Sequence, residues 1–226
     1  MAVSSIVAKI VAKLKELPRD QLLLLIIADF YLVGLILHAV PATLPYMLQL
    51  TPLVLLVFGV LALFPLAREG RKGVWLWALI TYGVTLSLEI IGVQTGKVFG
   101  AYQYGQVLGL QLAEVPLVIG FNWVIVVLGA ARLSEGLTAS PLLSALIVGA
   151  VCVIYDYALE PVAIGLDYWQ WEGGQIPLQN YAAWFLIAAA AGWVYRKLGL
   201  TAKTRLPEWY VGIQFIFFIG LQLLVV

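Results

Sequence analysis

The sequence predicts an all-α, polytopic integral membrane protein with about seven transmembrane helices, its N-terminus cytoplasmic and its C-terminus outside. Three observations lead to this fold class. Of the 226 residues, 63% are hydrophobic and only 11% are charged, which is more apolar surface than a soluble domain can bury. Several stretches reach the roughly 20 apolar residues that a helix needs to cross the hydrocarbon layer. The basic residues gather on one side of these stretches.

The apolar stretches are apolar on every face, whereas the strands of a membrane barrel alternate, so we predict a helix at each of them. The predicted spans are 21–40, 50–66, 74–92, 116–132, 141–160, 178–196 and 209–226. Residues 21–226 form a single transmembrane domain, because no loop is long enough to separate two bundles. Residues 1–20 place apolar side chains at helical spacing among lysines, which predicts an amphipathic segment on the inner leaflet.

The orientation follows from the basic residues. With seven spans, twelve of the thirteen Lys and Arg residues lie on one side and Lys97 lies on the other. The positive-inside rule assigns the basic side to the cytoplasm. We therefore expect a multi-pass protein of a bacterial cytoplasmic membrane, in contact with the lipid bilayer. The net charge of +1 gives no reason to expect a nucleic acid partner, and the oligomeric state stays open.

Carboxyl side chains inside spans are the first candidates for function, because each costs roughly 2.5–3.5 kcal/mol to insert. Asp29 lies near the middle of the first span, Glu89 near the outer end of the third, and Asp156 and Glu160 near the outer end of the fifth. Glu114, at the start of the fourth span, is a possible further member. The alternative is that these carboxyls only hold helices together, and for Asp29 we favour that structural role.

Asp156 and Glu160 are four residues apart, which places both carboxyls on one helix face. Two like charges this close in a low dielectric are unfavourable, so one member of the pair can keep its proton near neutral pH. A protonated carboxylic acid is a general acid. The pair therefore predicts proton transfer to a substrate.

Aromatic residues crowd the same end of the predicted bundle. Phe99, Tyr102 and Tyr104 lie in the first outer loop, and Trp169 and Trp171 lie in the second. Such rings suit an interfacial belt, which is the structural alternative. Beside carboxylic acids they also suit the protonation of an alkene, because ring faces stabilise a passing carbocation.

The residues that the chain lacks narrow the chemistry further. His38 is the only histidine and Cys152 the only cysteine, so a histidine-bound iron centre is excluded and we expect no metal site. No aspartate-rich motif is present that would hold magnesium and a diphosphate. His38, at the outer end of the first span, is either an interfacial polar contact or a possible site residue.

Three blocks of sequence resemble a known family. The run from Glu89 to Tyr104, the run from Glu114 to Trp123 and the run from Asp156 to Asn180 are similar to the membrane carotenoid biosynthesis proteins that include carotenoid 1,2-hydratases. Together they fall within about residues 85–197. Glu160 stands where the family more often has Asp, and Glu114 where it more often has Gly. The N-terminal third of the chain carries little of the resemblance.

The resemblance implies the addition of water to the terminal C1–C2 double bond of an acyclic, lycopene-like carotenoid, without a cofactor. It assigns the acid to Asp156 or Glu160 and the positioning of water to Glu89. Substrate binding is expected from the aromatic and amide side chains of the three blocks, namely Phe99, Tyr102, Tyr104, Asn122, Trp123, Trp169, Trp171 and Asn180. Two alternatives stay open, a membrane lycopene cyclase and a non-catalytic carotenoid-binding or transport protein.

Overall fold

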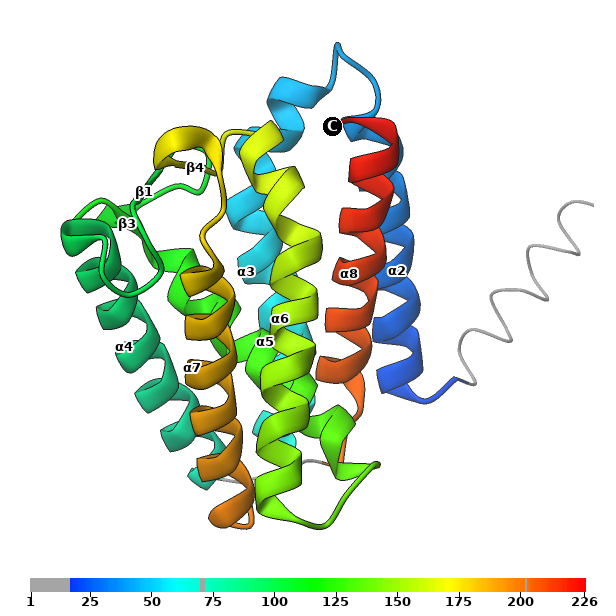
Figure 1. The fold of residues 1–226 in the computed structure, drawn as a ribbon. Coiled ribbons are helices and arrows are strands. Elements are labelled where there is room, and N and C mark those ends of the chain that lie inside the picture. Colours follow the sequence, from blue (N-terminus) through cyan, green and yellow to red (C-terminus); the bar gives the residue numbers. More distant parts are fainter. Residues whose placement is uncertain (1–16, 70–71, 202) are drawn as a thin grey trace, which may run out of the picture.

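The computed structural model of the protein describes residues 17–69, 72–201 and 203–226. Most of these residues form seven α-helices, and successive helices run in opposite directions (Figure 1). The helices are α2 (Arg19–His38), α3 (Leu44–Arg68), α4 (Lys72–Thr95), α5 (Leu117–Glu135), α6 (Pro141–Gly165), α7 (Leu178–Lys197) and α8 (Leu206–Leu224). Within the described ranges, six of them are long and apolar enough to cross a membrane. The prediction of an all-α, multi-pass membrane protein is therefore confirmed.

Helix α7 is the least apolar of the seven, because its first turn is polar and its last turn is basic. It still has 20 residues and packs along α6 (Figure 1). Two glycines allow this close packing, since a Cβ at Gly149 would lie 2.9 Å from Phe185 and a Cβ at Gly192 would lie 2.9 Å from Val148. Small residues bring membrane helices together in this way. Tight packing thus holds α7 in the bundle alongside the more apolar helices.

Each predicted span falls on one helix, and the bounds differ most at α3. This helix begins at Leu44 rather than at residue 50, with Pro45 in its first turn, where the missing N–H of a proline is not needed. Likewise, α6 continues through Pro161 to Gly165 instead of ending at residue 160. Of the predicted N-terminal segment, residues 1–16 lie outside the described residues. The assignment of 21–226 to a single domain stays a prediction.

Helix α5 lies at the centre of the bundle. Of its most apolar stretch, 72% is buried, against 17% for α2. Helix α5 contacts α3, α4, α6, α7 and α8, whereas α2 packs mainly against α8 and α3. Helix α2 therefore forms an outer wall of the bundle, next to α8 (Figure 1).

Short strands cover the end of the bundle where α4 ends and α5 begins (Figure 1). Strand β1 (Tyr102–Tyr104) pairs antiparallel with β4 (Trp169–Trp171), and a 3₁₀ turn follows at Glu172–Gly174. We call the β1–β4 pair the aromatic ribbon. A second pair joins β2 (Gln111–Leu112) to β3 (Val115–Pro116). The sequence predicts only loops here, so the four strands are a finding of the structure.

The basic residues lie at the other end of the bundle. Because the helices alternate in direction, Arg19, Lys72, Arg132, Arg196 and Arg205 all lie at the end opposite the aromatic ribbon. From the positive-inside rule we predict that this end faces the cytoplasm and that the ribbon lies at the outer surface.

Candidate active site

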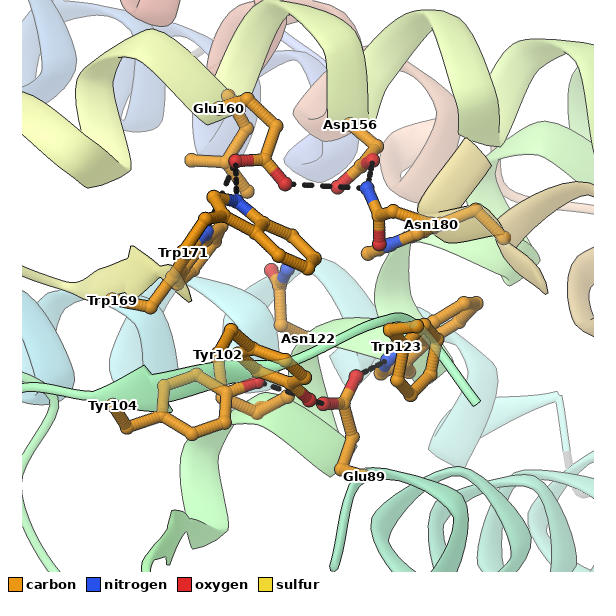
Figure 2. A pocket seen from close by; sticks show the side chains of 14 residues that line it. Glu89, Tyr102, Tyr104, Asn122, Trp123, Asp156, Glu160, Trp169, Trp171 and Asn180 are labelled. Atoms are coloured by element: carbon orange, nitrogen blue, oxygen red, sulfur yellow. Dashed lines mark hydrogen bonds between the residues drawn. The ribbon is translucent and has the colours of Figure 1, made fainter. Parts of the chain in front are cut away.

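Glu89 is buried beneath the aromatic ribbon, with only 3% of its surface exposed. Helix α4 carries it, and three side chains donate hydrogen bonds to its carboxyl group (Figure 2). The hydroxyls of Tyr102 and Tyr104 both donate to Oε2, the latter over 2.8 Å, and Nε1 of Trp123 donates to Oε1 over 2.8 Å. Both oxygens therefore accept hydrogen bonds, and the three donors occupy three of the roughly four acceptor positions of an ionised carboxylate.

Asp156 and Glu160 lie across the pocket from Glu89, on successive turns of α6 (Figure 2). Each is only 1% exposed. The side-chain amide of Asn180 on α7 contacts both, with Nδ2 2.7 Å from Oδ2 of Asp156 and 3.2 Å from Oε1 of Glu160. The indole N–H groups of Trp169 and Trp171 donate to Oε2 of Glu160 over 3.1 and 2.8 Å.

The two carboxyls of this pair differ in one respect. Both oxygens of Glu160 accept hydrogen bonds, whereas Oδ1 of Asp156 is buried without a partner among the described residues. A buried oxygen without a partner is costly, and the cost is relieved when it meets a donor or carries a proton that it can donate. Of the two carboxyls, Asp156 is therefore the one with an oxygen still open to a donor or to a proton.

The aromatic ribbon supplies four of the donors through the alternation of its strands. Tyr102 and Tyr104 face Glu89, and Trp169 and Trp171, their partners across the ribbon, face Glu160. Side chains two residues apart lie on the same face of a strand. One face of the ribbon therefore contacts both Glu89 and Glu160. Burial, and then the neighbouring Glu89, raise the pKa of both tyrosines well above the usual value of 10. Both phenols thus keep their protons and stay donors.

The carboxyls surround a small cavity of about 30 Å³, which we call the carboxylate pocket. A cavity above about 10–15 Å³ can hold a water molecule. Its lining contains no basic residue and consists of Glu89, Phe99, Tyr102, Tyr104, Ile119, Asn122, Trp123, Asp156, Leu159, Glu160, Trp169, Trp171, Asn180 and Trp184. Across the described part of the chain, no group of three His, Cys, Asp or Glu side chains is placed to hold a metal ion.

A larger cavity of about 310 Å³ adjoins the carboxylate pocket. Its walls are mainly apolar and come from α2, α3, α5, α6 and α8, so we call it the apolar slot. The two cavities share four lining residues, Ile119, Asn122, Leu159 and Trp169. They are therefore neighbouring compartments on either side of a common wall.

The structure brings most of the sequence-predicted site residues together. The three carboxyls and all eight predicted substrate-binding residues line the carboxylate pocket. Asp29 does not, because it lies on an exposed face of α2. Glu114 is also exposed, and it accepts a hydrogen bond from Gln94 over 3.4 Å in the outer loop. His38 is buried and lines the apolar slot instead.

The sequence reasoning missed three residues of the carboxylate pocket. Ile119 and Leu159 are ordinary apolar residues of membrane helices, so no sequence signal separates them from their neighbours. Trp184 stacks on Trp123 with ring centroids 3.7 Å apart and an angle of 17°. Trp184 lies four residues after Asn180 and therefore on the same face of α7, and this spacing is the signal from which it could have been predicted.

Comparison with known proteins fits this site. A family described as "Carotenoid biosynthesis protein" matches residues 49–225. Bisanhydrobacterioruberin hydratase from Haloarcula japonica is 33% identical over 160 residues, which cover 65% of this chain and 52% of that protein. The chain thus spans about half the length of this relative, and no solved structure matches it. The family match covers most of the chain and contains every residue of the carboxylate pocket, and the chain belongs to the carotenoid biosynthesis protein family.

Proposed function

We propose that the protein is a carotenoid hydratase that adds water to the terminal C1–C2 double bond of an acyclic carotenoid. The family supports a role in carotenoid biosynthesis, and the relative from Haloarcula japonica is named as a hydratase. The observation that carries the proposal is the pairing of two cavities. An apolar slot adjoins a pocket that contains three buried carboxyls, and they share a wall at Asn122 and Trp169.

This pairing suits one end of a long apolar chain. The slot would hold the isoprenoid chain, and the terminal alkene would lie among the carboxyls. Phe30, Val33 and Leu50 line the slot and are each more than 40% exposed, at 45%, 46% and 41%. We infer that the slot opens between α2 and α3 toward the hydrocarbon of the bilayer, from which the substrate enters.

The chemical steps follow from the hydrogen bonds of the carboxyls. Asp156 donates its proton from Oδ1 to the less substituted alkene carbon, and a tertiary carbocation forms at the other carbon. The faces of Tyr102 and Trp169 stabilise the cation. Water then attacks it and gives up a proton to Glu89, and the site is restored when a proton returns from Glu89 to Asp156. The net change is one water molecule added across one double bond.

Glu89 is suited to hold that water. An ionised carboxylate has about four acceptor positions. Two tyrosines and Trp123 occupy three of them, which leaves one for water. Asn122 lies between Glu89 and the Asp156–Glu160 pair and can orient the same water molecule (Figure 2).

Two alternatives fit the slot but use the pocket differently. A lycopene cyclase would begin with the same protonation and then exclude water, and room for a water molecule in the carboxylate pocket favours hydration. A carotenoid-binding or transport protein would need no proton donor, and the Asp156 oxygen that is buried without a partner among the described residues favours an enzyme. No cofactor is part of the proposal.

Expression of the chain in a bacterium that accumulates lycopene tests the proposal directly. Mass and absorption spectra of the extracted pigments should show a product heavier by one water molecule. An isomer of unchanged mass with a shortened chromophore would establish cyclisation instead. Unchanged pigment, with the protein confirmed in the membrane, would refute both activities on this substrate. Fractionation of the same cells tests the predicted cytoplasmic membrane location.

A further inference from the structure

His38 lines the apolar slot, and no part of the proposed reaction uses its side chain. The side chain is 8% exposed and lies in the last turn of α2. Its Nδ1 lies 2.7 Å from the carbonyl oxygen of Gly34. A carbonyl oxygen can only accept, so Nδ1 carries the hydrogen, and Nε2 of the neutral ring is an acceptor. Nε2 is buried and has no hydrogen-bond partner in the described part of the chain.

Other polar groups that line the slot are paired with protein atoms. Gln214 accepts from the hydroxyl of Tyr155 over 3.2 Å and donates to that of Tyr31 over 3.4 Å. The hydroxyl of Thr51 donates to the carbonyl of Met47 over 3.1 Å. Of the buried side-chain atoms without a partner in the described residues, only Nε2 of His38 is on a residue that lines the slot. A buried acceptor without a hydrogen bond costs free energy, and a donor from a bound ligand would remove this cost.

The surroundings of the imidazole favour a ligand hydroxyl over a water molecule. A buried water needs about two to four polar partners. The ring of His38 packs edge-on against Phe217, with centroids 5.5 Å apart, and its other polar atom is already bonded to the backbone. One acceptor in an apolar wall holds water poorly. It suits a hydroxyl group that an apolar chain carries into the slot.

We propose that the apolar slot binds an isoprenoid chain that carries a hydroxyl group, and that this hydroxyl donates a hydrogen bond to Nε2 of His38. This inference deepens the proposed function, because it names the ligand class of the same pair of cavities. His38 then distinguishes alcohols from hydrocarbons and ethers of the same length. It does so by binding and takes no part in proton transfer.

The test compares ligands that differ in one donor. Wild-type protein in proteoliposomes, and the Asp156→Asn variant in which turnover should be blocked, are incubated with radiolabelled geranylgeraniol, its methyl ether or the hydrocarbon of equal length. Protein-free liposomes correct for partition into lipid. Since one hydrogen bond is involved, the alcohol should bind about three- to tenfold more tightly than the ether.

Two variants test whether the preference for the alcohol over the ether depends on His38. His38→Phe keeps a ring in place but removes Nε2, so alcohol and ether should bind equally. Ser87→Ala is the matched control, because the Ser87 hydroxyl is bonded to its own helix and lies outside the slot, and this variant should keep the preference. Equal binding of alcohol and ether to the wild type would overturn the proposal, and this comparison does not depend on the folding of any variant. The absence of hydration in cells would refute the proposed function but leave this measurement intact.

Discussion

Replacing Asp156 with Asn separates the proton of this side chain from its place in the fold. In the structure, Oδ2 of Asp156 accepts from Asn180 over 2.7 Å, and Oδ1 is buried without a partner in the described residues. The amide oxygen of an asparagine can keep the bond to Asn180, while its NH₂ group takes the place of Oδ1. No existing hydrogen bond need be lost, so the free energy of unfolding should change by less than about 1 kcal/mol.

The effect of Asp156→Asn on activity should be much larger. A positioned general acid contributes about 10²–10⁴-fold to a rate, or roughly 3–5 kcal/mol of barrier. Initial rates of pigment hydration in isolated membranes measure this loss, and thermal unfolding of the same preparation measures stability. Glu160→Gln is the matched control. Three donors contact Glu160, and a glutamine leaves at least one of them unpaired, which should cost about 1–3 kcal/mol of stability.

The result that would refute this reasoning is specific. If Asp156→Asn hydrates its substrate within about tenfold of the wild-type rate, Asp156 is not the acid. If Asp156→Asn loses as much stability as Glu160→Gln, then the lack of a partner for Oδ1 of Asp156 among the described residues does not make this side chain easier to replace than Glu160.

Three further predictions concern the surroundings of the pocket. Glu89→Gln should abolish hydration and also lower stability by about 1–3 kcal/mol, because an amide nitrogen cannot accept from its present donors; unchanged thermal unfolding would contradict this. Gly100→Ala should destabilise the outer end by more than about 1 kcal/mol, because Gly100 has φ = 109° and a Cβ there would lie 2.4 Å from the proline ring that precedes α7. Gly173→Ala is its control in a thermal unfolding series, since Gly173 also has positive φ but no atom within 4 Å of the added Cβ, and an equal loss would argue against the contact. Tyr102 and Tyr104 should stay protonated at pH 10, because their pKa values are raised; their contribution to stability is complete below that pH and is lost only as pH rises through the higher folded values. Ultraviolet titration of the wild type and a double Tyr→Phe variant should then give equal phenolate signals at pH 10, and a larger signal from the wild type would contradict the burial of these phenols.

The carboxyls were the most predictable part of the site. Insertion of an acid into a span is expensive, so Glu89, Asp156 and Glu160 could be selected from hydropathy alone, and all three line the carboxylate pocket. The same reasoning also selects Asp29, which the structure leaves on an exposed face of α2. The cost of inserting an acid identifies an unusual residue, but it does not indicate whether that residue faces the interior of the bundle or its surface.

The facing of α2 could not be predicted because the helix is apolar all round. Its residues give no periodicity from which a buried stripe could be derived. For the same reason, the apolar slot could not be predicted, since α2 and α3 supply ordinary apolar side chains to its wall. The N-terminal third carries little family resemblance, yet it forms one side of the proposed substrate site.

The aromatic ribbon had a signal that the sequence reasoning did not use. Residues 102–104 read Tyr-Gln-Tyr and residues 169–171 read Trp-Gln-Trp, and in both the aromatic residues recur with a period of two. Such alternation is typical of a strand with one buried face. The rings were predicted individually as substrate contacts. Their pairing across two distant loops required the three-dimensional structure.

The inferred entrance of the slot between α2 and α3 has a consequence for how the proposed activity should be assayed. A substrate that arrives through the hydrocarbon is measured by its mole fraction in the bilayer and not by its concentration in water. Diluting a fixed amount of carotenoid into more lipid should therefore slow the reaction, even though the bulk concentration is unchanged. Acyl chains and detergent tails compete for the same entrance, and kinetic constants measured in micelles and in membranes should differ for this reason.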